Sequence, residues 1–221
     1  YYKGGKVKKG GCNMANRWTL NEEHLNVDKY LKACANLYGY VTPRQFLKLY
    51  NRYNENKINR EKYLLWLERL QNHSRLHYTL FSNAIVCARV PHKKIDEILY
   101  HQQGKKYYDP PKDELLKYAD PNYYEQSIYT KEMLNFLRNE LKVNRLTAES
   151  FLAKLVWYMR IEEPIQAEND LLESFGIEFN DLTQANNYFL RAQYLNNNTR
   201  KWANCGYTPK EISDIDLKNK R

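Results

Sequence analysis

Residues 76–90 have the sequence Leu-His-Tyr-Thr-Leu-Phe-Ser-Asn-Ala-Ile-Val-Cys-Ala-Arg-Val, and this stretch decides the fold. Apolar residues alternate with polar or weakly polar ones at its start, and a second apolar run extends from Ile85 to Val90. Ser82-Asn83 between the two runs is typical of a tight turn. The stretch therefore predicts a β-hairpin, which Pro91 ends.

Three amphipathic helices are predicted before the hairpin. Apolar residues recur at helical spacing over 27–38, and Gly39 ends that helix. Thr42-Pro43 provides an N-cap followed by proline at the first position of a second helix, and a third runs over about 60–71. With Tyr40-Val41 as a short strand, this order of elements is that of a winged helix.

Helical patterns continue after the hairpin. Asp109-Pro110-Pro111 is the clearest break in the chain, so we expect a winged-helix-like domain over 14–108 and an α-helical domain over 109–221. Helices are predicted at about 93–104, 112–118, 121–126, 130–142, 147–161, 164–176, 181–195 and from 209, with a short extended piece at 177–179. The predicted fold is mainly α: a winged-helix-like unit with one β-hairpin, followed by an α-helical bundle.

Residues 1–13 are predicted to be a translated leader. Lys9-Gly10-Gly11 can be encoded by AAG-GAG-G, the ribosome-binding sequence of bacterial messages, and Cys12-Asn13 separates it from Met14. The alternative is a disordered basic tail. Four lysines lie in these residues, so without them the formal net charge falls from +9 to +5.

The composition predicts a cytoplasmic protein that does not span a membrane. Hydrophobic residues make up 43% of the chain and charged residues 28%, and no apolar run approaches the roughly 20 residues of a membrane span. The four cysteines are widely spaced and form no CxxC pair, so they support neither a disulfide framework nor a zinc site.

The sequence does not predict an enzyme. It contains no glycine-rich phosphate loop before a helix and no GxSxG motif. His73 and His77 are four residues apart, but no carboxylate–histidine pattern accompanies them. We therefore expect no catalytic residues, no metal site and no cofactor.

Candidate DNA-binding residues lie on the third helix and the hairpin, because the third helix of a winged helix enters the major groove. They are Arg60, Lys62, Trp66, Arg69, Arg75, His77 and Arg89. Glu61 and Glu68 on the same helix would repel phosphate. Lys105-Lys106-Tyr107-Tyr108 is a second basic and aromatic candidate, although we favour a solvated linker there.

Residues 196–212 are the most motif-like part of the chain. Gly206 turns the chain, Thr208-Pro209 can cap a last helix, and Trp202 can pack back on the preceding helix. The segment is therefore predicted to be a structural clasp. Alternatively it displays a docking site for a protein partner, since Arg and Trp are enriched in such sites. The residues concerned are Arg200, Trp202, Tyr207, Thr208 and Pro209.

The pattern Asn-Thr-Arg-x-Trp-x-x-x-Gly-Tyr-Thr-Pro-x-Glu at 198–211 carries a family resemblance, together with Asn36-Leu-Tyr-Gly39 and Tyr50-Asn51. It resembles a group of uncharacterised helical proteins from low-GC Gram-positive bacteria, some of them close to the YecA/SEC-C family. The likeness spans most of residues 27–212. The chain lacks the Cys-rich zinc motif of SEC-C proteins, so the resemblance does not imply metal binding, and the group offers no activity to carry over.

These observations favour a non-enzymatic adaptor or regulator that acts through an unidentified protein partner, using the tyrosine-rich helical half and the clasp. The alternative is a winged-helix DNA-binding transcriptional regulator. A third hypothesis, an inhibitor of a host nucleic-acid machine encoded by a mobile element, depends only on small size and basic charge. Salt dependence separates the first two, because phosphate contacts weaken steeply as salt rises.

Overall fold

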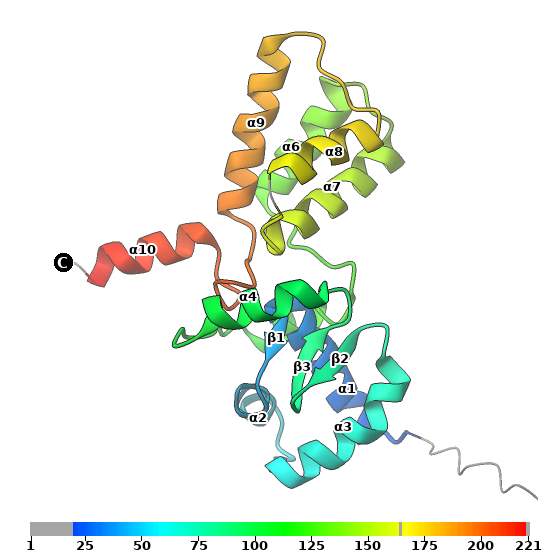
Figure 1. Ribbon diagram of the computed structural model, residues 1–221, viewed down its shortest axis with the longest axis vertical. Coiled ribbons are helices and arrows are strands. Elements are labelled where there is room, and N and C mark those ends of the chain that lie inside the picture. Colours follow the sequence, from blue (N-terminus) through cyan, green and yellow to red (C-terminus); the bar gives the residue numbers. More distant parts are fainter. Residues whose placement is uncertain (1–19, 164, 220–221) are drawn as a thin grey trace, which may run out of the picture.

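The protein is described by a computed structural model that covers residues 20–163 and 165–219 (Figure 1). Within these residues it has ten helices and one three-stranded antiparallel sheet. The predicted fold class, mainly α with one hairpin, is confirmed. The predicted leader, residues 1–13, lies outside the described residues.

The first part of the chain has the predicted order of helix, strand, helix, helix and hairpin. Its elements are α1 (Glu22–Tyr38), β1 (Tyr40–Val41), α2 (Pro43–Tyr53), α3 (Arg60–Ser74), β2 (Tyr78–Phe81) and β3 (Ala84–Cys87). The sheet order is β1-β3-β2, and Val86 pairs with both Tyr40 and Thr79. Ser82 and Asn83 form the hairpin turn with φ angles of 48° and 68°, the positive values that two-residue hairpin turns need.

Local capping fixes the start of α2, as the sequence predicted. Thr42 has extended backbone, and its hydroxyl accepts a hydrogen bond from the Gln45 amide at 3.2 Å. Pro43 occupies the first helical position, where its missing N–H costs nothing. The first turn carries no acidic side chain, so the positive end of the helix dipole stays unneutralised there.

The rest of the chain is helical. Its elements are α4 (His92–Gln102), α5 (Lys112–Lys117), α6 (Ile128–Asn139), α7 (Arg145–Arg160), α8 (Ile165–Ser174), α9 (Leu182–Asn197) and α10 (Pro209–Asn219). Residues 177–179 lie outside any helix and pair with no strand, so the short extended piece stays a prediction. In Figure 1, α6–α9 stand as one group above the sheet-containing part, and α10 extends away to the side.

The helix predicted at 121–126 is also wrong, because tertiary contacts occupy its backbone. The Asp120 carbonyl accepts a hydrogen bond from Asn36 at 2.8 Å, and the Pro121 carbonyl accepts one from Arg89. The Tyr123 carbonyl accepts one from Arg160 at 3.2 Å. These side chains hold residues 119–127, the linker between α5 and α6, in an irregular path.

The described residues form two hydrophobic cores. The first is built by α1–α5 and the sheet, and the second by α6–α9. Leu115 and Tyr118 belong to the first core, so α5 packs on the sheet-containing part, although the predicted domain boundary precedes it. That boundary stays a prediction. Ile161 and Trp202 also join the first core and tie the two parts together.

Candidate nucleic-acid interface

The predicted DNA-binding face of α3 is only partly open. Trp66 is 4% exposed and packs in the first core, so it does not lie on the outward face of α3 that a DNA-binding residue there requires. It lies three residues after Tyr63 and four before Leu70, both buried, and therefore shares their helical face. Lys62 forms an ion pair with Glu23 at 2.7 Å and lies 4.5 Å from the centroid of the Trp66 ring.

The other predicted DNA-binding residues do not gather on one open surface. Arg60 and Arg75 are exposed, and Arg69 is half-buried. His77 is half-buried too, and burial, followed by the charge of Lys32, lowers its pKa. Arg89 is directed toward α7, where its guanidinium lies 4.0 Å from the centroid of the Trp157 ring.

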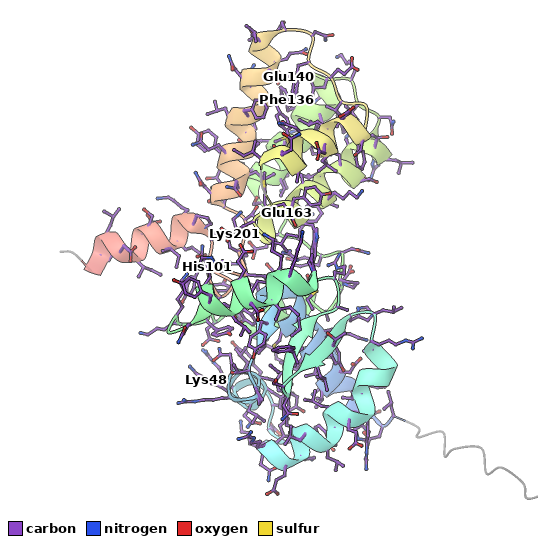
Figure 2. The ribbon with its side chains drawn as sticks, in the orientation of Figure 1. Lys48, His101, Phe136, Glu140, Glu163 and Lys201 are labelled. Atoms are coloured by element: carbon purple, nitrogen blue, oxygen red, sulfur yellow. The ribbon has the colours of Figure 1, made fainter. Side chains whose placement is uncertain are left out.

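A basic groove of about 660 Å³ lies beside α2 instead. Five exposed cationic side chains line it, and we call it the α2 groove: Arg44, Lys48, Arg52, Lys105 and Lys106. The first three recur every four residues, so they follow one face of α2. Figure 2 shows Lys48 pointing away from the body of the molecule.

Two tyrosines and one carboxylate complete the α2 groove. Tyr107 and Tyr207 contribute aromatic side chains, and Asp109 forms an ion pair with Arg52. The Tyr107 hydroxyl donates to Gln102 Oε1 at 2.9 Å, which anchors the segment predicted to be a solvated linker. The four-residue spacing of Arg44, Lys48 and Arg52 is visible in the sequence, whereas the winged-helix interpretation predicts α3 as the DNA-binding helix.

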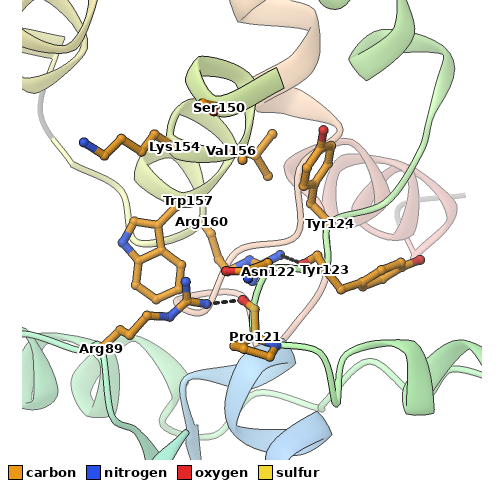
Figure 3. A pocket seen from close by; sticks show the side chains of 11 residues that line it. Arg89, Pro121, Asn122, Tyr123, Tyr124, Ser150, Lys154, Val156, Trp157 and Arg160 are labelled. Carbon is orange, nitrogen blue, oxygen red and sulfur yellow. Dashed lines mark hydrogen bonds between the residues drawn. The ribbon is translucent and has the colours of Figure 1, made fainter. Parts of the chain in front are cut away.

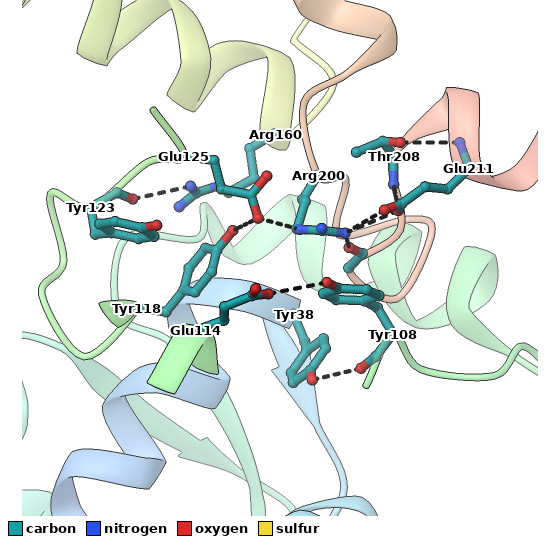
Figure 4. Close-up of polar contacts among 11 residues, drawn as sticks. Tyr38, Tyr108, Glu114, Tyr118, Tyr123, Glu125, Arg160, Arg200, Thr208 and Glu211 are labelled. Atoms are coloured by element: carbon teal, nitrogen blue, oxygen red, sulfur yellow. Dashed lines mark hydrogen bonds and ion pairs between the residues drawn. The ribbon is translucent and has the colours of Figure 1, made fainter. Parts of the chain in front are cut away.

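The predicted clasp lies inside the molecule and joins its two parts (Figure 4). Arg200 Nε donates to Glu125 Oε1 at 2.6 Å, and its Nη1 donates to Glu211 Oε2 at 3.0 Å. Its guanidinium also lies 3.6 Å from the centroid of the Tyr108 ring. Thr208 accepts from the Glu211 amide at 3.1 Å and so caps α10, which begins at Pro209.

Trp202 is the central side chain of the clasp. It is 0% exposed, and its indole N–H donates to the Asn36 carbonyl at 3.0 Å. Its ring meets Trp157 edge-on at 5.1 Å between centroids. Trp202 therefore packs on the first core and not, as expected, on the preceding helix, and it is buried away from any partner.

Lys201 is buried beside Trp202, at 2% exposed, and its ammonium donates to the Met159 carbonyl and to Asn196 Oδ1. Burial lowers the pKa of Lys201 to about 8, from an ordinary value of 10.5. Between these values the unfolded chain binds more protons than the folded protein. Stability contributed by this group therefore rises with pH through that window.

The natural sequence and the Lys201→Met variant differ in their free energies of unfolding. We expect this difference to change by about 1 kcal/mol in favour of the natural sequence between pH 7 and pH 9. Urea unfolding of both proteins at each pH measures this difference, and the comparison cancels the titration of other groups. If the unfolding free energies of the two proteins change equally between pH 7 and pH 9, the lowered pKa of Lys201 is contradicted.

A comparison with protein-family models finds no match to the chain, and comparisons with curated proteins and with solved structures find none either. The resemblance to helical proteins near the YecA/SEC-C family therefore stays a prediction.

The described residues contain no group of three or more His, Cys, Asp or Glu placed to hold a metal ion. Cys34, Cys87 and Cys205 are free and buried. No helix in the described part of the chain is both long and apolar enough to cross a bilayer.

Proposed function

We propose that the protein is a non-enzymatic regulator that binds duplex DNA through ionic contacts between the α2 groove and the phosphate backbone. The observation that carries this proposal is the convergence of five exposed cations from α2 and the segment after α4 on one groove. Cationic side chains supply most of the sequence-independent affinity of DNA-binding proteins.

The spacing along α2 suits a strand of DNA. Arg44 and Arg52 are eight residues apart, which corresponds to about 12 Å along a helix. Over that length of B-DNA one strand carries about three to four phosphates. Tyr107 and Tyr207 add aromatic ring surface at the groove, and the amino end of α2 adds a favourable dipole for an anion.

The distribution of charge along the chain supports the same surface. Residues 20–108 contain 15 Lys and Arg against 8 Asp and Glu, whereas residues 109–219 contain 13 against 18. The positive field is therefore concentrated on the part of the protein that carries the α2 groove. A field of this sign steers DNA toward that part during association.

The order of elements in the first part is that of a winged helix, but α3 has few free base-contacting groups. Lys62 is half-buried and paired with Glu23, unlike the exposed Arg52, and Trp66 is buried. We therefore propose backbone binding with little sequence preference, in contrast to base recognition by α3. Phosphate contacts position a protein on DNA, whereas base contacts give specificity.

Fluorescence anisotropy with a labelled mixed-sequence duplex tests the proposal. We expect binding that weakens as salt rises, with a slope of log K against log salt of about −4 for four to five neutralised phosphates. Arg60→Gln/Arg75→Gln should bind as the natural sequence does. Loss of binding in this pair would move the interface back to α3, and absence of binding at low salt would contradict DNA binding altogether.

Protein docking is the second candidate function, and α10 is the observation that favours it. This helix extends away from the body of the molecule (Figure 1), and its Ile215 and Leu217 are 40% and 59% exposed. The clasp itself offers little to a partner, because Arg200, Trp202 and Thr208 are buried. An adaptor role would therefore use α10, and its complex would respond little to salt.

A further inference from the structure

A second site lies away from the α2 groove, in a cavity of about 300 Å³ between the two parts of the protein. We call it the linker cavity. Its wall comes from three segments: the end of the hairpin at Arg89, the linker residues 121–124, and one face of α7 from Ser150 to Arg160. Figure 3 shows the Arg89 and Arg160 side chains both reaching the linker, Arg89 at Pro121 and Arg160 at Tyr123.

The charged side chains that line the linker cavity are all positive. Arg89, Lys154 and Arg160 line it, and none of its lining residues is an Asp or Glu. Arg89 and Lys154 are exposed at its rim, whereas Arg160 is 4% exposed at its base. Walls of low polarity around like charges focus the electric field, which favours an anion inside.

Arg160 is a buried cation with only neutral acceptors. Its Nη1 donates to Asn36 Oδ1 at 2.6 Å and its Nη2 to the Tyr123 carbonyl at 3.2 Å. Its Nε has no hydrogen-bond partner among the described residues, and Glu125, the carboxylate that acts on it electrostatically, is ion-paired with Arg200 instead. A buried charge without an ion-pair partner of its own costs stability, and a bound anion would relieve that cost.

The shape and lining of the linker cavity limit the ligand. Its volume lies at the lower end of the range for small-molecule sites, about 300–1,000 Å³. Apolar surface comes from Pro121, Val156 and Trp157, and the Arg89 guanidinium is held against the Trp157 ring. Arginine recognises carboxylate and phosphate groups through paired N–H donors.

We propose that the linker cavity binds a small organic anion, with a carboxylate or phosphate group at Arg160 and Arg89 and an apolar body against Trp157. Because its wall combines both parts of the chain, the bound anion joins them. The site is independent of the DNA-binding proposal, since no residue of the α2 groove lines it.

Titration calorimetry and thermal unfolding of the full chain test this inference with phenyl phosphate, benzoate and neutral phenol at constant ionic strength. We expect at least one anion to bind and to raise the melting temperature, whereas phenol does neither. The anion that binds more tightly identifies the preferred headgroup.

Variants locate the binding site. Arg160→Gln removes a buried side chain and can unfold the protein, so the exposed pair Arg89→Gln/Lys154→Gln is used. We expect its Kd for the anion to rise about tenfold or more. Arg145→Gln, on α7 but outside the cavity, should leave Kd unchanged. Failure of both anions to bind, or equal Kd values in the pair and the natural sequence, would overturn the proposal, whatever the result with DNA.

Discussion

Replacing Trp202 with alanine is expected to lower the free energy of unfolding by about 3–5 kcal/mol. The side chain is fully buried and belongs to the first core. Its removal leaves a cavity against Trp157 and deprives the Asn36 carbonyl of its indole donor. Both losses act on the contact that holds the two parts of the chain together.

Urea unfolding followed by circular dichroism measures this effect. Trp202→Phe is the matched variant, because it keeps most of the apolar volume but not the N–H group, and it should lose less stability than Trp202→Ala. An unchanged midpoint for Trp202→Ala would contradict the clasp and would return Trp202 to the role of a docking residue.

Substitution of Gly39 tests the packing of Trp202 from the side of the first core. A Cβ atom added there would lie 2.3 Å from the Trp202 ring, and the φ angle is +73°. Gly104 has nearly the same φ, +74°, but nothing within 4 Å of an added Cβ. We expect Gly104→Ala to lower the free energy of unfolding by about 1 kcal/mol, through backbone strain alone. Gly39→Ala should lower it clearly more, because the added Cβ also meets the Trp202 ring.

Neutralising the stripe on α2 is expected to weaken duplex DNA binding by roughly 10- to 100-fold at low salt. The variant is Arg44→Gln/Lys48→Gln/Arg52→Gln. Each exposed ionic contact is worth about 0.5–1 kcal/mol, and three of them account for this factor. The three side chains are exposed, so the fold should persist.

A charge-matched control separates the α2 groove from general attraction. Lys131→Gln/Arg138→Gln/Arg145→Gln removes three exposed cations from α6 and α7. The net charge of both variants is the same, so a non-specific effect would weaken their binding equally. We expect the control to bind DNA nearly as well as the natural sequence, and equal losses in the two variants would contradict the proposed interface.

The sequence predicts features that depend on neighbouring residues. Thr42-Pro43 and Ser82-Asn83 act within one or two residues of the helix start and the turn that they specify. By contrast, the path of residues 121–126 depends on Asn36, Arg89 and Arg160, which are distant in sequence. Propensity within the segment contains no information on those contacts.

The two sites differ in how far the sequence could have revealed them. The row of cations on α2 is a local pattern, and the four-residue spacing of Arg44, Lys48 and Arg52 in the sequence predicts it. The position of Trp66 could also be inferred from its helical spacing to Tyr63 and Leu70. The linker cavity combines three separated segments, and no spacing in the sequence brings them together.

DNA binding by the α2 groove is tested by the salt dependence of duplex binding, compared between the natural sequence and the α2 triple variant. Each lost phosphate contact reduces the slope of log K against log salt by about 0.9. We therefore predict a slope of about −4 for the natural sequence and one shallower by about 2.7 for the variant. Identical slopes, or no binding by either protein at low salt, would contradict the claim that α2 holds the DNA backbone.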